Sequence, residues 1–155
     1  MKTLIVFYSR TGITRKVGQK IAAELGADSE EIIDTENRAG AWGYLKSGKE
    51  AMQKKLGVIA PVKYNPENYD LVVVGTPTWS STMACAVRTY LTEHKTAIKE
   101  IAVWATHISG GGEKANRFMA ELVGKTARAE IVLKSKDVAT DNYDEKFTAF
   151  IEKLK

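Results

Sequence analysis

Short apolar runs alternate with amphipathic segments along the chain. The strongest runs, at residues 4–8, 71–74 and 101–105, are unbroken and rich in branched or aromatic side chains. Such runs are typical of strands that are buried on both faces of a parallel sheet. The runs at 28–34 and 129–133 are more polar, which favours the edges of a sheet. The pattern therefore predicts three central strands and two edge strands.

Apolar residues recur at helical spacing between these runs. Gly26 and Gly124 stand where C-terminal caps belong, and Ser81 or Thr82 is the expected N-cap of the third helix. Four helices with an apolar stripe are predicted, at residues 13–25, 83–91, 115–123 and 143–154. One further helix is predicted near 41–56, in the long connection 35–69.

Strands and helices alternate with no repeat and no linker, so we expect one α/β domain over residues 1–155. A single doubly wound, five-stranded parallel sheet in the order 2-1-3-4-5, with helices on both faces, places the polar strands at the edges. That order opens a crevice beyond the carboxyl ends of strands one and three. We therefore expect the loops that begin at Ser9 and Gly75 to line one ligand site.

The first loop reads SRTGIT and leads directly into a predicted helix. Its hydroxyl groups, the free amides of the helix start and the helix dipole favour an anion, and Gly12 lets the backbone approach closely. The same residues could serve only as helix caps. No lysine follows at P-loop spacing and no acidic pair ends the first strand, which argues against a nucleotide triphosphatase and a magnesium-dependent phospho-receiver. The loop suits a phosphate monoester held without a metal.

Two further loops carry groups that suit a planar ligand. Residues 75–82, GTPTWSST, combine a rigid turn with hydroxyl groups and Trp79, which we expect to be exposed and available for stacking. Trp79 could alternatively pack in the core. Residues 106–113, THISGGGE, contain three consecutive glycines, which allow the backbone to approach a bound ring.

Composition narrows the class of protein further. A formal net charge of +4 is too small to indicate nucleic-acid binding by itself. The single cysteine, Cys85, excludes an internal disulfide and a cysteine-rich zinc site, and we expect it to be a buried core residue. No apolar stretch approaches the ~20 residues that span a bilayer, and no signal peptide is recognised, so we expect a cytoplasmic protein.

The three loops together resemble the short-chain flavodoxins, and the likeness covers essentially the whole chain. SRTGIT is similar to the S/T-x-T-G-x-T phosphate loop of that family. The resemblance implies noncovalently bound FMN, with its phosphate at the first loop and its isoalloxazine between the other two. It implies no catalytic or metal-binding residue. The implied cofactor-binding residues are Ser9, Arg10, Thr11, Gly12, Ile13, Thr14, Pro77, Thr78, Trp79, Ser80, Ser81, Thr82, Thr106, His107, Ser109, Gly110 and Gly111.

Two features depart from the family. Flavodoxins are often acidic around the flavin, whereas residues 38–63 hold six cations, including Arg38, and only Glu50 as an anion. We expect most of this segment to be a solvated helix face, which near the flavin would suit an acidic partner or an anionic substrate. In addition, residues 76–82 contain no glycine, and Ser81 occupies a position where flavodoxin-like sequences often have the glycine whose peptide flips on one-electron reduction.

The sequence thus indicates an FMN-binding, flavodoxin-like electron-transfer protein. The alternatives are an FMN-dependent NAD(P)H oxidoreductase acting on quinones or similar acceptors, in which His107 could donate a proton, and a binding module whose flavin site has decayed. Trp42 and Tyr44 could form a second aromatic wall over the flavin. The expected partner is a redox protein or a small electron donor or acceptor, with no nucleic acid and no membrane span, and the chain is expected to be a monomer or homodimer.

Overall fold

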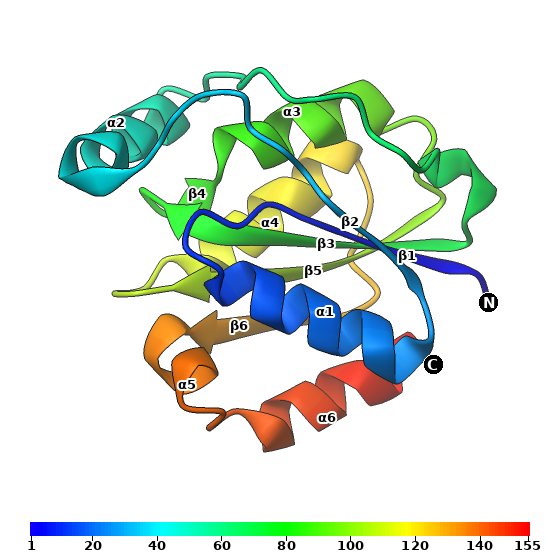
Figure 1. The fold of residues 1–155 in the computed structure, drawn as a ribbon. Coiled ribbons are helices and arrows are strands. Elements are labelled where there is room, and N and C mark those ends of the chain that lie inside the picture. The colour runs from blue at the N-terminus through cyan, green and yellow to red at the C-terminus, as the bar shows by residue number, and fades with distance from the viewer.

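The computed structural model describes residues 1–155 as one sheet with helices on both of its faces (Figure 1). Strands and helices alternate along the chain, and a 3-10 turn, η1, precedes the third strand. The elements are β1 (Thr3–Phe7), α1 (Ile13–Leu25), β2 (Asp28–Glu31), α2 (Gly40–Met52), η1 (Pro66–Asn68), β3 (Leu71–Trp79), β4 (Thr82–Met83), α3 (Cys85–His94), β5 (Glu100–His107), α4 (Gly112–Val123), β6 (Glu130–Lys134), α5 (Ser135–Ala139) and α6 (Asp144–Leu154).

The five long strands are parallel and lie in the order β2-β1-β3-β5-β6. This confirms the expected order 2-1-3-4-5, since β4 is an additional short strand that pairs only with β3. The polar strands β2 and β6 lie at the edges, as predicted. The reversal of winding falls between β1 and β3, so the chain leaves the adjacent carboxyl ends of these two strands toward opposite faces of the sheet.

Each face of the sheet is buried under its own layer of helices. Val72 and Val74 belong to the cluster that includes residues of α3 and α4, whereas Leu71 and Val73 belong to the cluster that includes residues of α1 and α6. Because both faces are covered, the central strands read as continuous apolar runs instead of alternating ones.

The segment after Val74 differs from its prediction. The sheet continues to Trp79, and residues 78–79 pair with residues 82–83 in a tight antiparallel hairpin. Met83 and Thr82 are therefore strand residues, and Ala84 is the N-cap of α3, so the expected cap at Ser81 or Thr82 was wrong. The second predicted loop, residues 75–82, is therefore largely a β-hairpin that extends the sheet beyond the carboxyl end of β1.

Other boundaries differ by a few residues. α2 ends at Met52, four residues before the predicted limit. β2 ends at Glu31, three residues before the end of the predicted run at 28–34. The short helix α5, directly after β6, was not predicted. None of the helices is both long and apolar enough to cross a membrane.

Candidate functional site

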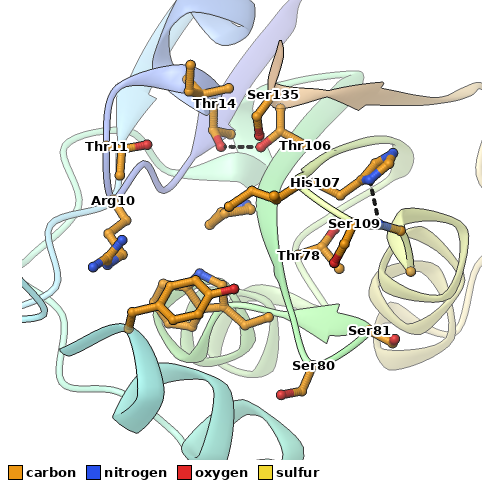
Figure 2. Close-up of a pocket in the computed structure, with 17 residues that line it drawn as sticks. Arg10, Thr11, Thr14, Thr78, Ser80, Ser81, Thr106, His107, Ser109 and Ser135 are labelled. Atoms are coloured by element: carbon orange, nitrogen blue, oxygen red, sulfur yellow. Dashed lines mark hydrogen bonds between the residues drawn. The ribbon is translucent and has the colours of Figure 1, made fainter. Parts of the chain in front are cut away.

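A cavity of about 430 Å³ lies beyond the carboxyl ends of β1, β3 and β5 (Figure 2). All three loops singled out in the sequence contribute to its wall, including the two, beginning at Ser9 and Gly75, for which the topology predicted a shared site. Of the predicted cofactor-binding residues, only Ser9, Gly12 and Thr82 are absent from the lining. Ile108 and Ser135 are added to it, and Tyr44, which was proposed as part of an aromatic wall, also lines it. The lining residues are Arg10, Thr11, Ile13, Thr14, Tyr44, Pro77, Thr78, Trp79, Ser80, Ser81, Thr106, His107, Ile108, Ser109, Gly110, Gly111 and Ser135.

The first loop forms a tight turn at the start of α1. Gly12 is the N-cap with φ of +98°, a conformation that residues with a Cβ rarely adopt, and its amide donates to Ser9 Oγ over 3.0 Å. Ser9 and Gly12 therefore shape the turn from outside the cavity. The amides of Ile13 and Thr14 have no backbone acceptor, as is normal in a first helical turn. This end of the cavity offers free donors and the positive end of the α1 dipole.

A buried hydroxyl pair joins the first loop to the end of β5. Thr14 Oγ1 and Thr106 Oγ1 are 2.8 Å apart, and both residues are almost fully buried. Ser135, from the start of α5, lies beside this pair in Figure 2. Ser135 directly follows β6, whose carboxyl end lies at the same rim of the sheet. Its position after that strand is the sequence feature from which Ser135 could have been predicted as a site residue.

The β3–β4 hairpin turns on two serines. Ser80 and Ser81 have φ angles of 49° and 59°, the pattern of a type I′ turn, in which asparagine and glycine are preferred. Ser80 Oγ donates to the carbonyl of Gly48 in α2 over 2.7 Å. A Cβ on Gly111 would lie 2.6 Å from Ser81 Oγ, so the loop at residues 106–113, here called the glycine loop, packs directly against the hairpin.

Trp79 lines the cavity but is only 5% exposed, so the expectation of an exposed stacking aromatic was wrong. Its ring packs edge-on against Tyr8, with 5.4 Å between ring centroids, and the Arg38 guanidinium lies over it at 5.3 Å. The exposed apolar groups at the rim are Tyr44, 51% exposed, and Ile108, 75% exposed. Trp42 does not line the cavity, so of the two proposed wall residues only Tyr44 does.

His107 has a defined hydrogen-bonding role in the glycine loop. Its Nδ1 accepts the amide proton of Gly110 over 2.7 Å. In the neutral ring the proton is therefore on Nε2, which is left free to donate. Thr82, in contrast, is buried behind the hairpin, where its Oγ1 accepts from Arg88.

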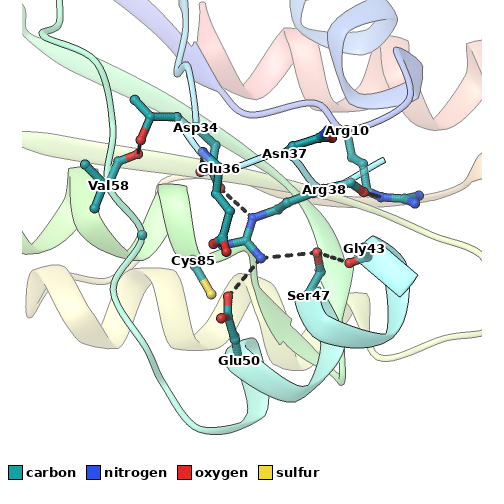
Figure 3. A network of polar contacts seen from close by, with 12 residues as sticks. Arg10, Asp34, Glu36, Asn37, Arg38, Gly43, Ser47, Glu50, Val58 and Cys85 are labelled. Carbon is teal, nitrogen blue, oxygen red and sulfur yellow. Dashed lines mark hydrogen bonds and ion pairs between the residues drawn. The ribbon is translucent and has the colours of Figure 1, made fainter. Parts of the chain in front are cut away.

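Arg38 is the centre of a buried ionic network between α2 and the connection that precedes it (Figure 3). Its guanidinium binds Asp34 at 2.6 Å, Glu50 at 2.9 Å and Glu36 at 3.1 Å. Lys55 binds Glu50 at 2.8 Å, and Lys46 binds Glu36. Arg38 therefore does not belong to a solvated basic face, and the basic segment is opposed by Asp34 and Glu36 as well as Glu50.

The network also fixes protonation states. Burial opposes the charge on Arg38, but its hydrogen bonds to Asp34 and Glu50 outweigh burial and raise its pKa. Burial likewise acts to raise the pKa of Glu50, yet the hydrogen bonds from Lys55 and Arg38 bring that pKa below its ordinary value. Burial raises the pKa of the Cys85 thiol, which is fully enclosed, as expected of a core residue.

Arg10 connects this network to the cavity. Its Nε donates to the Arg38 carbonyl and its Nη2 to the Gly40 carbonyl, both over 2.9 Å. The guanidinium lies 5.5 Å from the centroid of the Tyr44 ring. The first loop and the start of α2 are thus held together on one side of the cavity.

Fold and site together define a doubly wound α/β protein whose cavity lies at the point where the winding of the sheet reverses. Residues 2–154 match the flavodoxin family model, and the chain belongs to the flavodoxin family. No protein of curated function matches the sequence significantly.

Several solved structures are similar to the chain. A flavoprotein from Lactobacillus acidophilus NCFM in complex with FMN is 25% identical, with a TM-score of 0.71 over 92% of this chain and 98% of that chain. A protein from Bacteroides uniformis ATCC 8492 is 20% identical, with a TM-score of 0.77 over 94% of this chain and 97% of that chain. The two-electron reduced flavodoxin of Megasphaera elsdenii is 15% identical, with a TM-score of 0.60 over 99% of both chains. The last two likenesses concern the fold alone.

Proposed function

We propose that the chain binds FMN noncovalently in the 430 Å³ cavity and transfers electrons between redox partners. The observation that carries this proposal is the convergence of three strand-end loops on one cavity. One end of that cavity is a helix N-terminus, and the other is a slot between the hairpin and the glycine loop. Its volume lies within the range of small-molecule sites. Family membership and the FMN complex of the Lactobacillus acidophilus flavoprotein support the same ligand.

The residues present fit the cofactor. The unpaired amides of Ile13 and Thr14, with the hydroxyl of Thr11, would hold the phosphate. Thr78 Oγ1 is buried in the cavity wall without a hydrogen-bond partner, and a bound polar ligand would satisfy it. Gly110 and Gly111 have φ angles of 118° and 85° and no Cβ, so the backbone of the glycine loop could approach the flavin ring closely.

Bound FMN supplies the redox chemistry, and the protein supplies position and electrostatics. The Thr14–Thr106 pair holds the phosphate end of the cavity against the sheet. Arg10 adds a positive charge at the same wall. The rim formed by Tyr44 and Ile108 leaves one edge of the cavity open, where an electron partner would approach.

A visible-spectrum experiment tests this function. Purified protein titrated with FMN is expected to bind one equivalent, and the holoprotein is expected to be reduced by a flavodoxin reductase in stopped flow. If dithionite reduces the holoprotein but the flavodoxin reductase does not, the carrier role is excluded.

His107 favours a second candidate function, an FMN-dependent NAD(P)H oxidoreductase. Its Nε2 proton is free and the residue lines the cavity, so it could protonate an acceptor during two-electron reduction. This function predicts direct bleaching of the bound flavin by NADH or NADPH. It also predicts slower acceptor turnover in His107→Gln with unchanged FMN affinity. No bleaching of the flavin at millimolar NADH or NADPH would exclude the oxidoreductase function.

A further inference from the structure

The helix α2 is amphipathic, but it buries its small and polar side chains and exposes its large apolar ones. Its buried residues include Gly43, Ser47 and Glu50, which are small or polar. Its outward stripe consists of Trp42, Leu45, Lys49 and Met52, at the spacing of one helix face; Trp42 is 79% exposed, Leu45 65% and Met52 66%. Large apolar side chains that lie together on an exposed face are typical of an interaction site.

The reversal has a structural cause on the inner face. The ionic network around Arg38 fills the space beneath α2, where Ser47 and Glu50 bind its guanidinium. A Cβ on Gly43 would lie 2.3 Å from the Arg38 carbonyl, so the helix is seated on that backbone. Since the inner face must be polar and small, the apolar side chains of α2 can only face outward.

The outward stripe is continuous with the rim of the proposed flavin cavity. A second hollow of about 330 Å³ lies between α2 and the hairpin and is lined by Leu45 and Met52 among others. It shares four lining residues with the main cavity: Tyr44, Thr78, Trp79 and Ser80. The Ser80–Gly48 hydrogen bond fixes the helix against the hairpin there. A partner seated on α2 would therefore lie beside the flavin edge.

Two lysines at the stripe are not paired with a carboxylate. Lys49 lies within it and Lys54 just beyond it, and neither has an acidic partner; both are exposed. The carboxylates of the region, Asp34, Glu36 and Glu50, are already engaged by Arg38, Lys46 and Lys55.

We propose that the outward face of α2 docks an acidic electron-transfer protein, with the apolar stripe as its anchor and Lys49 and Lys54 as its steering charges. This inference rests on the proposed carrier function and specifies its partner. A second copy of the chain would bring the unpaired lysines of both copies into one interface. In addition, a 13-residue helix, about 20 Å long, offers little of the ~1,200 Å² that a stable interface needs. A flat lipid surface would leave the hollow beside α2 unfilled.

The test uses an acidic [2Fe–2S] ferredoxin and a basic c-type cytochrome as probes of the 155-residue chain. Amide NMR shifts report binding and need no flavin, and stopped-flow electron exchange reports transfer in the holoprotein. We expect the α2 amides to shift with the ferredoxin only, and the exchange rate to fall as salt is added.

Charge-reversal variants locate the effect. K49E/K54E is expected to lower the association rate with the ferredoxin at least tenfold at low salt. K95E/K99E is the matched control: it makes the same change in net charge at two exposed lysines after α3, next to the start of β5 and away from α2, and is expected to change the rate less than about twofold. W42S is expected to weaken binding roughly tenfold through loss of the apolar anchor.

Several results would overturn the proposal. They are equal binding of both probes, equal effects of the two lysine pairs, sedimentation as a dimer that W42S dissociates, and binding to phosphatidylglycerol vesicles without ferredoxin binding. Failure of FMN to bind would remove the proposed carrier function. The NMR arm would still decide whether α2 docks the acidic probe.

Discussion

Ser80 and Ser81 occupy the two central positions of the β3–β4 hairpin with positive φ angles. A residue with a Cβ pays a conformational cost of about 1–2 kcal/mol in this region. The two serines are not equivalent, because Ser80 Oγ also binds the Gly48 carbonyl. The strain therefore accompanies a contact that joins the hairpin to α2, at the wall of the proposed flavin site.

Replacing Ser81 tests this strain. Ser81→Gly is expected to stabilise the protein by about 1 kcal/mol, or to raise Tm by about 2–4 °C, because glycine adopts positive φ without a steric cost. Thermal unfolding followed by circular dichroism measures it. Ser29→Gly in the extended strand β2 is the control and is expected to lower Tm. An equal decrease in both variants would show that the hairpin is not strained.

Sequence reasoning identified most residues of the cavity because they follow strands whose order could be predicted. It misjudged Trp79, since aromatic identity does not reveal on which side of a hairpin a ring packs. Tyr44 was proposed from the sequence together with Trp42, but the choice between these two aromatic residues depends on how α2 packs. Ser135 follows β6, and only the position of that strand in the sheet could have indicated it.

At the scale of elements, α2 depends on buried charges instead of an apolar seat. Asp34 and Glu50 have side chains that are 2% and 7% exposed, and both bind the Arg38 guanidinium. This arrangement could not be predicted from the sequence, because the cations at 38–63 resemble an ordinary solvated face and their partner Asp34 lies outside that stretch.

Removing the central cation tests the seat of α2. Arg38→Met is expected to destabilise the protein by about 3–5 kcal/mol, because it leaves the buried carboxylate of Asp34 without its cation and removes one cation from that of Glu50, which keeps Lys55. Urea unfolding measures the loss. The triple variant D34N/R38M/E50Q removes the uncompensated charges and is expected to recover part of the stability. No recovery would mean that packing of the guanidinium on Trp79 matters more than its charge.

The network also has a pH dependence of definite sign. The folded-state pKa of Glu50 is depressed below its ordinary value of 4.5, so its stabilising effect is present above about pH 4.5 and is lost as pH falls through the folded-state pKa. The difference in unfolding free energy between the wild type and Glu50→Gln should therefore be largest near neutral pH and shrink on acidification. A difference that grows toward low pH would contradict this assignment.

At the scale of the whole molecule, two helical layers close on one sheet, and the closeness of that packing sets the position of the first loop. A Cβ on Gly18 of α1 would lie 2.4 Å from the Phe7 ring of β1. The helix can thus approach the sheet only where it has no side chain. The order of the strands and their burial followed from the apolar runs, whereas this contact depends on the packing of two elements and has no signature in the pattern.

The contact predicts a cost for a small substitution. Gly18→Ala is expected to destabilise by about 1–3 kcal/mol, even though alanine favours helix, because the added methyl group overlaps the Phe7 ring. The double variant G18A/F7L makes room for the methyl group and should recover part of the loss. Chemical denaturation of the single and double variants measures both effects, and a stabilising Gly18→Ala would contradict the packing described.

The central claim is that the cavity at the carboxyl ends of β1, β3 and β5 binds FMN. Titration of the protein with FMN, followed by quenching of flavin fluorescence, tests it most directly. We expect saturation at one FMN per chain, and affinity at least tenfold weaker in Gly12→Val, whose Cβ is incompatible with φ of +98° and disturbs the free amides of α1. Circular dichroism should show that this variant remains folded. A wild-type protein that leaves FMN fluorescence unchanged, or one whose affinity is indifferent to Gly12→Val, would contradict the account.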